Sequence, residues 1–238
     1  MTRPRRYLPR LIDCLRRNES GVALLEFSFS LPIVLTLSLA GAELTNYVIT
    51  KMRIGQIALH LADNAARIGS GSQLQAKTIS EADISDLLVG ADLQSGELKL
   101  LTNGRVILSS VEPDPTNSGK SRIRWQRCKG AKTGLNSTYG AQGDKNLAGI
   151  GPTNRQVAAP DSGVTMFVQV RYQYTPLIQT SLSPSTEFNE VASMMVRDRR
   201  DTSDDSALGN SKALHPRGIY RVTGVTPSLC PGQQELET

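Results

Sequence analysis

The pattern of hydrophobic and polar positions begins with a long apolar run. Apolar residues dominate positions 22–42, and Glu26 is the only charged side chain among them. A run of about 20 such residues has the length that an α-helix needs to cross the hydrocarbon core of a bilayer. The pattern therefore predicts a transmembrane helix segment over 22–42. A carboxylate inside such a segment is costly, by roughly 2.5–3.5 kcal/mol, which makes Glu26 a candidate functional residue.

A second pattern follows directly, over residues 43–69. Apolar residues recur there at steps of three and four, whereas polar and charged residues fill the other positions, which is typical of an amphipathic helix. The apolar positions are Leu44, Val48, Met52, Ile54, Ile57, Leu61, Ala65 and Ile68. The segment predicts an extension of the membrane helix, so that one helix runs from about 22 to 68 and is roughly 70 Å long. Glu43, at the outer edge of the apolar run, is expected to face water, with a role in helix contact as the alternative.

Residues 70–238 predict an exported α+β domain. Ser80 and Asp83 resemble a capping box and predict a short helix over about 80–93. Asn103-Gly104 between two apolar runs favours a β-hairpin. Alternating or apolar stretches predict strands at 122–127, 164–174 and 187–196, and a short edge strand within 218–225.

The intervening segments have the composition of loops. Residues 129–162 are rich in Gly, Asn, Thr and Pro and predict a long surface loop, and 198–214 are expected to be mobile. The expected fold class is α+β: a long N-terminal helix, transmembrane and then amphipathic, packed on an antiparallel β-sheet.

Charge predicts how the chain lies across a membrane. The formal net charge is +5, and residues 1–21 hold six arginines against two acidic residues, which accounts for four of those charges. Basic flanks stay in the cytoplasm, so 1–21 are expected to be a cytoplasmic leader and the C-terminal domain is expected outside. The remainder is close to neutral and has no basic stripe interleaved with aromatic residues, so nucleic-acid binding is not indicated.

The sequence offers little to catalysis or metal binding. It contains no nucleophile motif, nucleotide-binding glycine loop or zinc pattern, so we expect no enzyme and no cofactor. His60 and His215 are not in ligand spacing with the cysteines. Cys128 and Cys230 lie on the exported side, where two cysteines predict one disulfide, with free buried thiols as the alternative.

The residues around the start of the apolar run carry a resemblance to a known family. Gly21-Val22, Glu26-Phe27 and Leu31-Pro32, behind a basic leader, resemble the TadE family of minor pseudopilin-like proteins of Flp/Tad pilus assembly. TadF and TadG-like relatives share the pattern. The resemblance covers residues 15–55 best, and it implies a pilin-like fold in the bacterial inner membrane.

The same resemblance implies roles for individual residues. A prepilin peptidase would cut between Gly21 and Val22, and Glu26 with Phe27 would contact neighbouring pilin-like subunits. The Glu26 carboxylate would meet the amino group of Val22 in another chain. The implied partners are other pilin-like subunits, the prepilin peptidase, an inner-membrane assembly platform and membrane lipid.

Two other interpretations of the N-terminus stay open. A basic start, an apolar stretch and Ala40-Gly41-Ala42 also describe a secretory signal peptide, although the run is long for one and contains Glu26. The segment is equally typical of an uncleaved membrane anchor. The three interpretations predict different mature N-termini, which are Val22 for the pseudopilin, Glu43 for the secreted domain and Met1 for the anchor.

Overall fold

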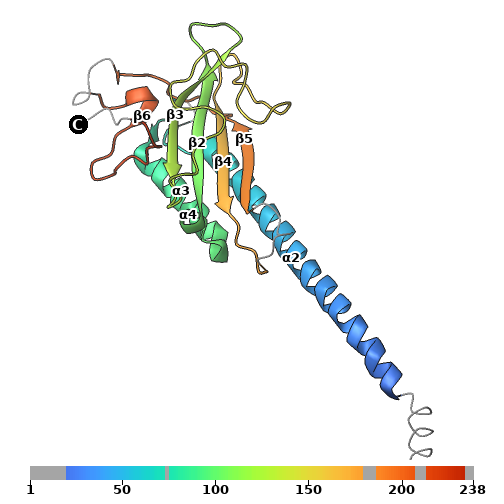
Figure 1. Ribbon diagram of the computed structural model, residues 1–238. Coiled ribbons are helices and arrows are strands. Elements are labelled where there is room, and N and C mark those ends of the chain that lie inside the picture. The colour runs from blue at the N-terminus through green and yellow to red at the C-terminus, as the bar shows by residue number, and fades with distance from the viewer. Residues whose placement is uncertain (1–19, 73–74, 179–185, 207–212, 234–238) are drawn as a thin grey trace, which may run out of the picture.

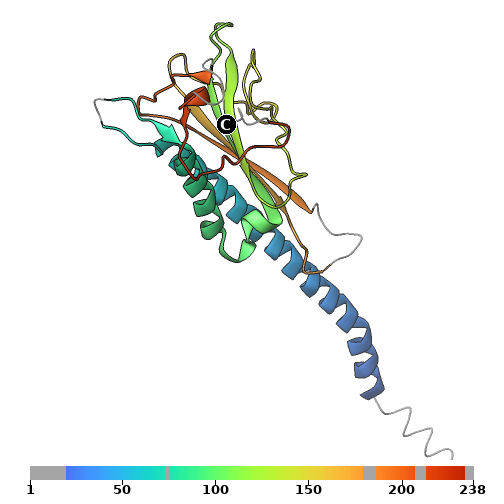
Figure 2. The same cartoon turned by 90° about the vertical axis from the view of Figure 1, so that its left-hand side faces the viewer.

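The longest element is the helix α2, Ser20–Arg67, which has 48 residues and continues through Pro32. The computed structural model describes residues 20–72, 75–178, 186–206 and 213–233. Figures 1 and 2 show α2 leaving the domain as a single rod, with only its C-terminal part beside the sheet. The predicted long helix is thus confirmed.

The end of α2 is fixed by its neighbours. The Arg200 guanidinium donates to the carbonyls of Ala65 and Ala66, at 3.2 and 2.9 Å. These are among the last carbonyls of a helix, which have no partner within it. Gly69 follows with a positive φ of 112°, and a Cβ there would lie 2.5 Å from the Thr78 carbonyl oxygen. The helix expected to run to about residue 68 therefore ends one residue earlier, two residues before this glycine.

The main sheet has four antiparallel strands in the order β3-β2-β4-β5. The strands are β2 (Gly104–Pro113), β3 (Ser121–Lys129), β4 (Thr165–Gln173) and β5 (Glu187–Met195). The strands predicted at 122–127, 164–174 and 187–196 correspond to β3, β4 and β5. The α+β class with a long helix on an antiparallel sheet is confirmed.

The main core lies between α2 and one face of the sheet. α2 packs on β4 and β5, and the helix α3 (Glu81–Ser95) packs beside α2. Alternate residues of the strands point into this layer, as the pleat requires. The buried members from the helix and the two central strands include Ile54, Ala58, Leu61, Ala62, Ala65, Val106, Leu108, Met166, Val168 and Val170.

The other face of the sheet is covered by irregular chain. Val111, Ile123, Ile150 and Phe167 form a second buried cluster, which places the long 129–162 segment over the sheet. Consequently β2 is buried on both faces along nearly its whole length. Trp125, Tyr172 and Tyr174 are buried as well, in agreement with a packing role.

The predicted capping box is present at the start of α3. The Ser80 hydroxyl accepts from the Asp83 N–H at 3.2 Å, and the Asp83 carboxylate accepts from the Ser80 N–H at 2.9 Å. Each group thereby satisfies an amide that a helix start leaves without a partner. The predicted second helix is confirmed, and it ends two residues later than expected.

The predicted hairpin at Asn103-Gly104 is wrong. A short 3₁₀ turn, η1 (Gly96–Leu98), and a single helical turn, α4 (Leu100–Asn103), precede β2, so no strand enters from that side. Leu100 is fully buried, which holds this turn against the core. Gly104 is extended rather than turned, and a Cβ there would lie 2.4 Å from the Arg171 carbonyl oxygen. The glycine therefore permits close approach of β4, not a tight turn.

Two further expectations need correction. The short strand β6 (Ile219–Tyr220) pairs in parallel with β1 (Ile79–Ser80) in a separate sheet, not at an edge of the main one. Residues 198–206, expected to be mobile, are bonded to the domain, because Lys77 exchanges backbone hydrogen bonds with Arg199 and Asp201. Residues 207–212 of that segment lie outside the described part of the chain.

Candidate functional site

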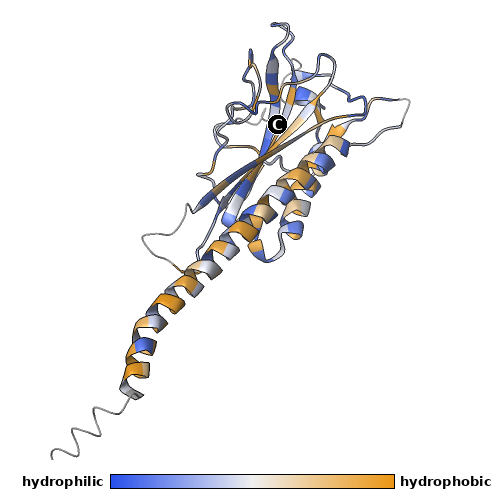
Figure 3. Ribbon diagram, turned by 90° about the vertical axis from the view of Figure 1, so that its right-hand side faces the viewer, coloured by the Kyte–Doolittle hydropathy of each residue, from blue (hydrophilic) through white to orange (hydrophobic). Residues whose placement is uncertain are grey.

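The first half of α2 is bare. Every side chain from 21 to 42 is exposed, and large apolar residues such as Leu24 and Phe29 have 73% and 71% of their surface accessible. Figure 3 shows that this part of the ribbon is mostly hydrophobic. Within the described residues, α2 is the one helix long and apolar enough to cross a membrane, which is compatible with a single-pass membrane protein.

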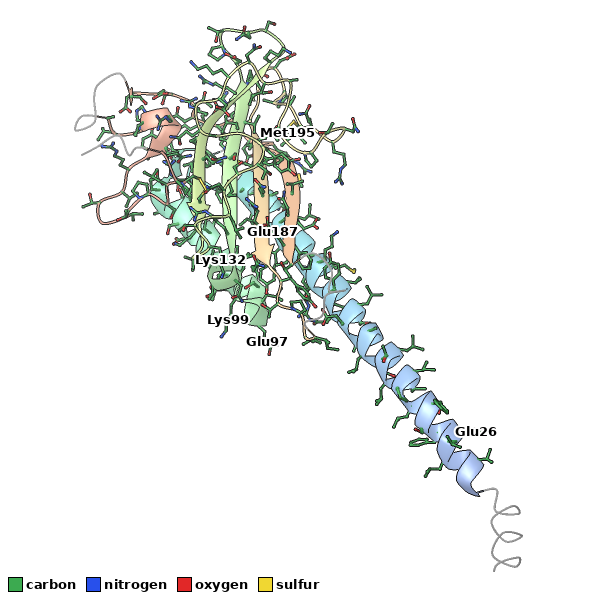
Figure 4. The ribbon with its side chains drawn as sticks, in the orientation of Figure 1. Glu26, Glu97, Lys99, Lys132, Glu187 and Met195 are labelled. Atoms are coloured by element: carbon green, nitrogen blue, oxygen red, sulfur yellow. A yellow bond between two sulfur atoms is a disulfide. The ribbon has the colours of Figure 1, made fainter. Side chains whose placement is uncertain are left out.

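The four residues singled out by the sequence lie in the first turns of this bare half. Val22 and Glu26 are one turn apart and so share a face of the helix, and Phe27 is exposed beside them. Glu26 makes no hydrogen bond or ion pair with any other described residue. Figure 4 places it near the free end of α2, far from the sheet. A partner for this carboxylate would have to come from outside the described chain.

Gly21 has no packing reason to be a glycine. A Cβ built at this position would meet no heavy atom within 4 Å, and its φ is not in the left-handed region. Glycine costs a helix roughly 1 kcal/mol relative to alanine. The fold itself therefore does not require glycine at this position.

Glu43 marks the point where the helix enters the domain, and it does not face water as expected. Its side chain is buried and accepts from the Tyr174 hydroxyl at 2.7 Å. It also accepts from the backbone N–H groups of Leu177 and Ile178, at 2.8 and 3.1 Å. Glu43 is thus a contact residue, but its partners lie in the segment after β4 and not on another helix. These donors satisfy a carboxylate that burial would otherwise penalise.

Aromatic side chains complete this junction. The Tyr47 ring packs edge-on against Tyr174 and Phe188, with centroid distances of 5.4 and 4.9 Å. Asn46 donates to the Tyr174 hydroxyl at 2.9 Å. Burial, followed by the hydrogen bond to the Glu43 carboxylate, raises the pKa of Tyr174. We call Glu43, Asn46, Tyr47, Tyr174 and Phe188 the collar, and it fixes the helix to the sheet where the bare half begins.

The two cysteines of the domain form the predicted bridge. Cys128 and Cys230 are joined by a disulfide with a Cα–Cα distance of 4.8 Å, across 102 positions of sequence. The Cys128 amide donates to the Ser228 carbonyl at 2.7 Å, so the backbones are bonded as well. Ile107 packs with the bridge on the sheet face opposite α2. The C-terminal segment is thereby tied to β3.

The acidic residues after β5 accept hydrogen bonds that join this segment to the C-terminal part of the domain. Asp201 accepts from the Tyr220 hydroxyl at 2.9 Å, and Asp205 accepts from the N–H of Leu214 at 2.6 Å. His215 lies 3.7 Å from Asp205, and His60 is exposed on α2. Among the described residues, no group of three or more His, Cys, Asp or Glu is arranged to hold a metal ion.

The sequence paired Cys128 with Cys230 correctly but missed the collar, and the roles of Gly21 and Glu26 stay predictions. The only signal for the collar was an acid at the edge of an apolar run, and its partner Tyr174 is 131 positions away. No protein-family model, curated protein or solved structure matches this chain.

Proposed function

We propose that this protein is a minor pilin-like component, similar to the TadE family, of a Flp/Tad-type pilus or a related secretion machine. The role is non-enzymatic. Residues 22–42 would lie in the bacterial inner membrane, with the basic leader in the cytoplasm and the domain in the periplasm. The observation that carries the proposal is the division of α2 into a bare apolar half and a half seated on a folded domain.

The length of the bare half fits a bilayer. Residues 22–42 at 1.5 Å per residue span about 30 Å, which is the thickness of the hydrocarbon core. The collar would then lie at the periplasmic surface of the inner membrane. Because Glu43 is buried and its carboxylate is hydrogen-bonded, it is compatible with both lipid and water around the collar. The helix would thus present its bare half to lipid and to other pilin-like helices.

Processing is the first part of the proposal. A prepilin peptidase would cleave between Gly21 and Val22, and the absence of any packing need for Gly21 supports a requirement from outside the fold. Gly21→Leu should leave the full-length, leader-bearing protein in the membrane. Gly41→Leu is a matched control, since Gly41 also has no neighbour for a Cβ, and this variant should be processed normally.

Mass spectrometry of the mature N-terminus decides between the three interpretations. Val22 is the expected first residue, Met1 would indicate an uncleaved anchor, and Glu43 would indicate a secreted domain. The buried position of Glu43 in a continuous helix favours an intact chain at that point. Normal processing of Gly21→Leu would contradict the pseudopilin assignment.

Subunit contact is the second part. Glu26 would pair with the Val22 amino group of a neighbouring subunit, where the low-dielectric surroundings strengthen the pair while desolvation offsets much of the gain. The value of such a pair lies in register and choice of partner. Phe27, exposed next to Glu26, would pack in the same contact.

The test compares two polar positions one turn apart. Glu26→Ala should enter the membrane at least as well as the wild-type chain, because it removes a carboxylate from lipid. It should be processed normally but lose co-purification with pilin-like partners. Ser30→Ala, whose hydroxyl only bonds its own helix at Phe27, should retain them. Wild-type assembly by Glu26→Ala would exclude the proposed role of the carboxylate.

A further inference from the structure

A groove lies at the end of the sheet far from the bare half of α2. It has a volume of about 620 Å³ and runs between the ends of β2 and β3 and the segment that follows β5. Figure 4 labels Met195, which lines it, at the opposite end of the molecule from Glu26. The volume is in the range of about 300–1,000 Å³ found for small-molecule sites.

The lining of this groove is strongly cationic. Five arginines line it against two carboxylates, namely Arg122, Arg124, Arg197, Arg199 and Arg200 against Glu112 and Asp198. Glu112 already accepts from both Arg122 and Arg124, at 3.3 and 2.9 Å. Asp198 is engaged by Lys77 at 2.7 Å. A third carboxylate, that of Asp204, does not line the groove but lies 3.7 Å from the Arg124 guanidinium. Five arginines against these three carboxylates still leave positive charge in excess.

Several guanidinium nitrogens in the groove lining are buried without a hydrogen-bond partner. They are Nε of Arg122, Nε of Arg124, and Nε and Nη1 of Arg200, taking partners among the described residues. The Arg124 side chain is only 5% exposed. Burial lowers the pKa of Arg200 to about 10, which still leaves it cationic at neutral pH. Buried donors of this kind are unusual in proteins, and an anionic group in the groove would give them acceptors.

The arginines are held in place by the fold rather than by one another. Arg124 donates to the carbonyls of Thr202 and Ser203, at 2.5 and 3.1 Å. Arg200 donates to the last carbonyls of α2, as described above. Prearranged donors lose little freedom when a ligand binds, which favours recognition of an anion. The opposite wall is apolar and includes Pro113, Pro115 and Pro160.

We propose that this groove binds an organic oxyanion, whose carboxylate or phosphate ester meets the arginines while its body lies along the proline wall. The site is independent of the proposed membrane function, since it shares no residue with the bare half of α2. An oxyanion is the natural partner of guanidinium groups, because charge-assisted N–H···O bonds are stronger than neutral ones. The apolar wall and the volume indicate a ligand larger than a bare ion.

The test is calorimetric titration of the full chain in a neutral polyoxyethylene detergent. Digalacturonate and glucose 6-phosphate serve as carboxylate and phosphate-ester probes, and maltose serves as the neutral disaccharide. At least one of the two anionic probes should bind, and maltose should not. The probe that binds more tightly identifies whether the groove prefers a carboxylate or a phosphate ester. Binding should weaken as salt is added, because exposed charges are screened.

Variants locate the site. Arg122→Gln and Arg197→Gln should each weaken binding by about tenfold, the loss expected for one charge-assisted contact. Arg155→Gln removes an exposed arginine that does not line the groove, and it should bind as the wild type does. Thermal unfolding of each variant verifies that the fold is retained.

Four outcomes would overturn the proposal. They are no binding of either anionic probe, equal binding of maltose, an equal loss in Arg155→Gln, and binding of inorganic phosphate as tight as that of the organic anions. The last would show an ion site in which the proline wall has no part.

Discussion

The two halves of α2 belong to one unbroken helix but bury their side chains against different partners. Residues 21–42 are exposed on every side, whereas the second half inserts Ile54, Ala58 and Leu61 into the core, each at most 2% exposed. The first half is apolar all around, and the second has one stripe rich in alanine, which lets the sheet approach closely. Apolar residues on all sides suit lipid, and a single stripe suits packing on a protein layer.

Two of the acids of α2, Glu26 and Glu43, show the same contrast. Glu26 is exposed and has no partner among the described residues, and Glu43 is buried and accepts three hydrogen bonds. Both residues lie in or beside apolar sequence, so whether each carboxylate finds hydrogen-bond donors depends on what surrounds the helix. Glu43 is explained by its own domain, whereas the partner that we propose for Glu26 is another pilin-like chain.

The largest effect is expected on the free energy of unfolding of the domain, with none on the bare half of the helix. Removing the Cys128–Cys230 bridge by a double change to serine should lower the free energy of unfolding by about 4 kcal/mol. The chain-entropy estimate for a loop of about 100 residues is roughly 4.7 kcal/mol, and measured values are often lower. Urea titration in neutral detergent, followed by far-ultraviolet circular dichroism, measures the change.

The helical circular dichroism that remains after the domain unfolds tests whether the two halves of α2 are independent. The bare half should remain helical in detergent after the domain has unfolded, because its backbone bonds are internal and its surroundings are apolar. Loss of all helix in one transition would show that the two halves are not independent. Cys14→Ser, which leaves the bridge intact, should unfold as the wild type does.

A matched pair of leucines gives the next largest difference. Leu61→Ala should destabilise the domain by about 3 kcal/mol, since it leaves a cavity beneath the sheet. Leu35→Ala, at a position with 51% of its surface exposed, should change the stability of the domain by less than about 0.5 kcal/mol. Both are measured by urea unfolding in the same detergent. A similar loss from both would indicate that the bare half contacts the domain.

The sequence predicted the features that depend on local pattern. The helix over 22–68 follows from the spacing of apolar residues, and the strands β3, β4 and β5 follow from alternation. The capping box at Ser80 is a local arrangement that needs only four residues. The disulfide could be predicted without knowledge of the fold, because two cysteines fall on the side of the membrane expected to be oxidising.

The features that the sequence did not predict depend on distant contacts. Gly104 carries the signature of a turn, but the approach of the Arg171 carbonyl decides its role. Glu43 was assigned to water because Tyr174 and Leu177 cannot be placed beside it from the sequence. The arginines of the groove come from β3 and from the segment after β5, and the sharing of Glu112 by Arg122 and Arg124 is visible only in the fold. The role of Glu26 stays a prediction.

The two acids provide a smaller and more specific difference. Glu43→Gln keeps one acceptor oxygen but loses the charge, so it should lower the stability of the domain by about 1–2 kcal/mol. Glu26→Gln should change it by less than about 0.5 kcal/mol, because Glu26 contacts nothing in the domain. Thermal unfolding of the domain in detergent measures both. Equal stability of the two variants would contradict the collar as an anchor.

The smallest effect is a response to acid that should be confined to the domain. The Asp114 carboxylate accepts from Thr116, Asn117 and Asn146, and these bonds, led by those from the Thr116 and Asn117 side chains, hold its pKa well below the usual value. A folded pKa below the unfolded one of about 3.9 contributes stability that is fully present above that pH. The contribution is lost as the pH falls further toward the folded pKa. Asp114→Asn should therefore be less stable near neutral pH and lose less stability on acidification below about pH 4.

Glu97→Gln, at an exposed residue with no bond to another described residue, should keep the wild-type response. Urea unfolding at a series of pH values measures both slopes, and a wild-type slope in Asp114→Asn would assign the acid sensitivity to other carboxylates of the domain.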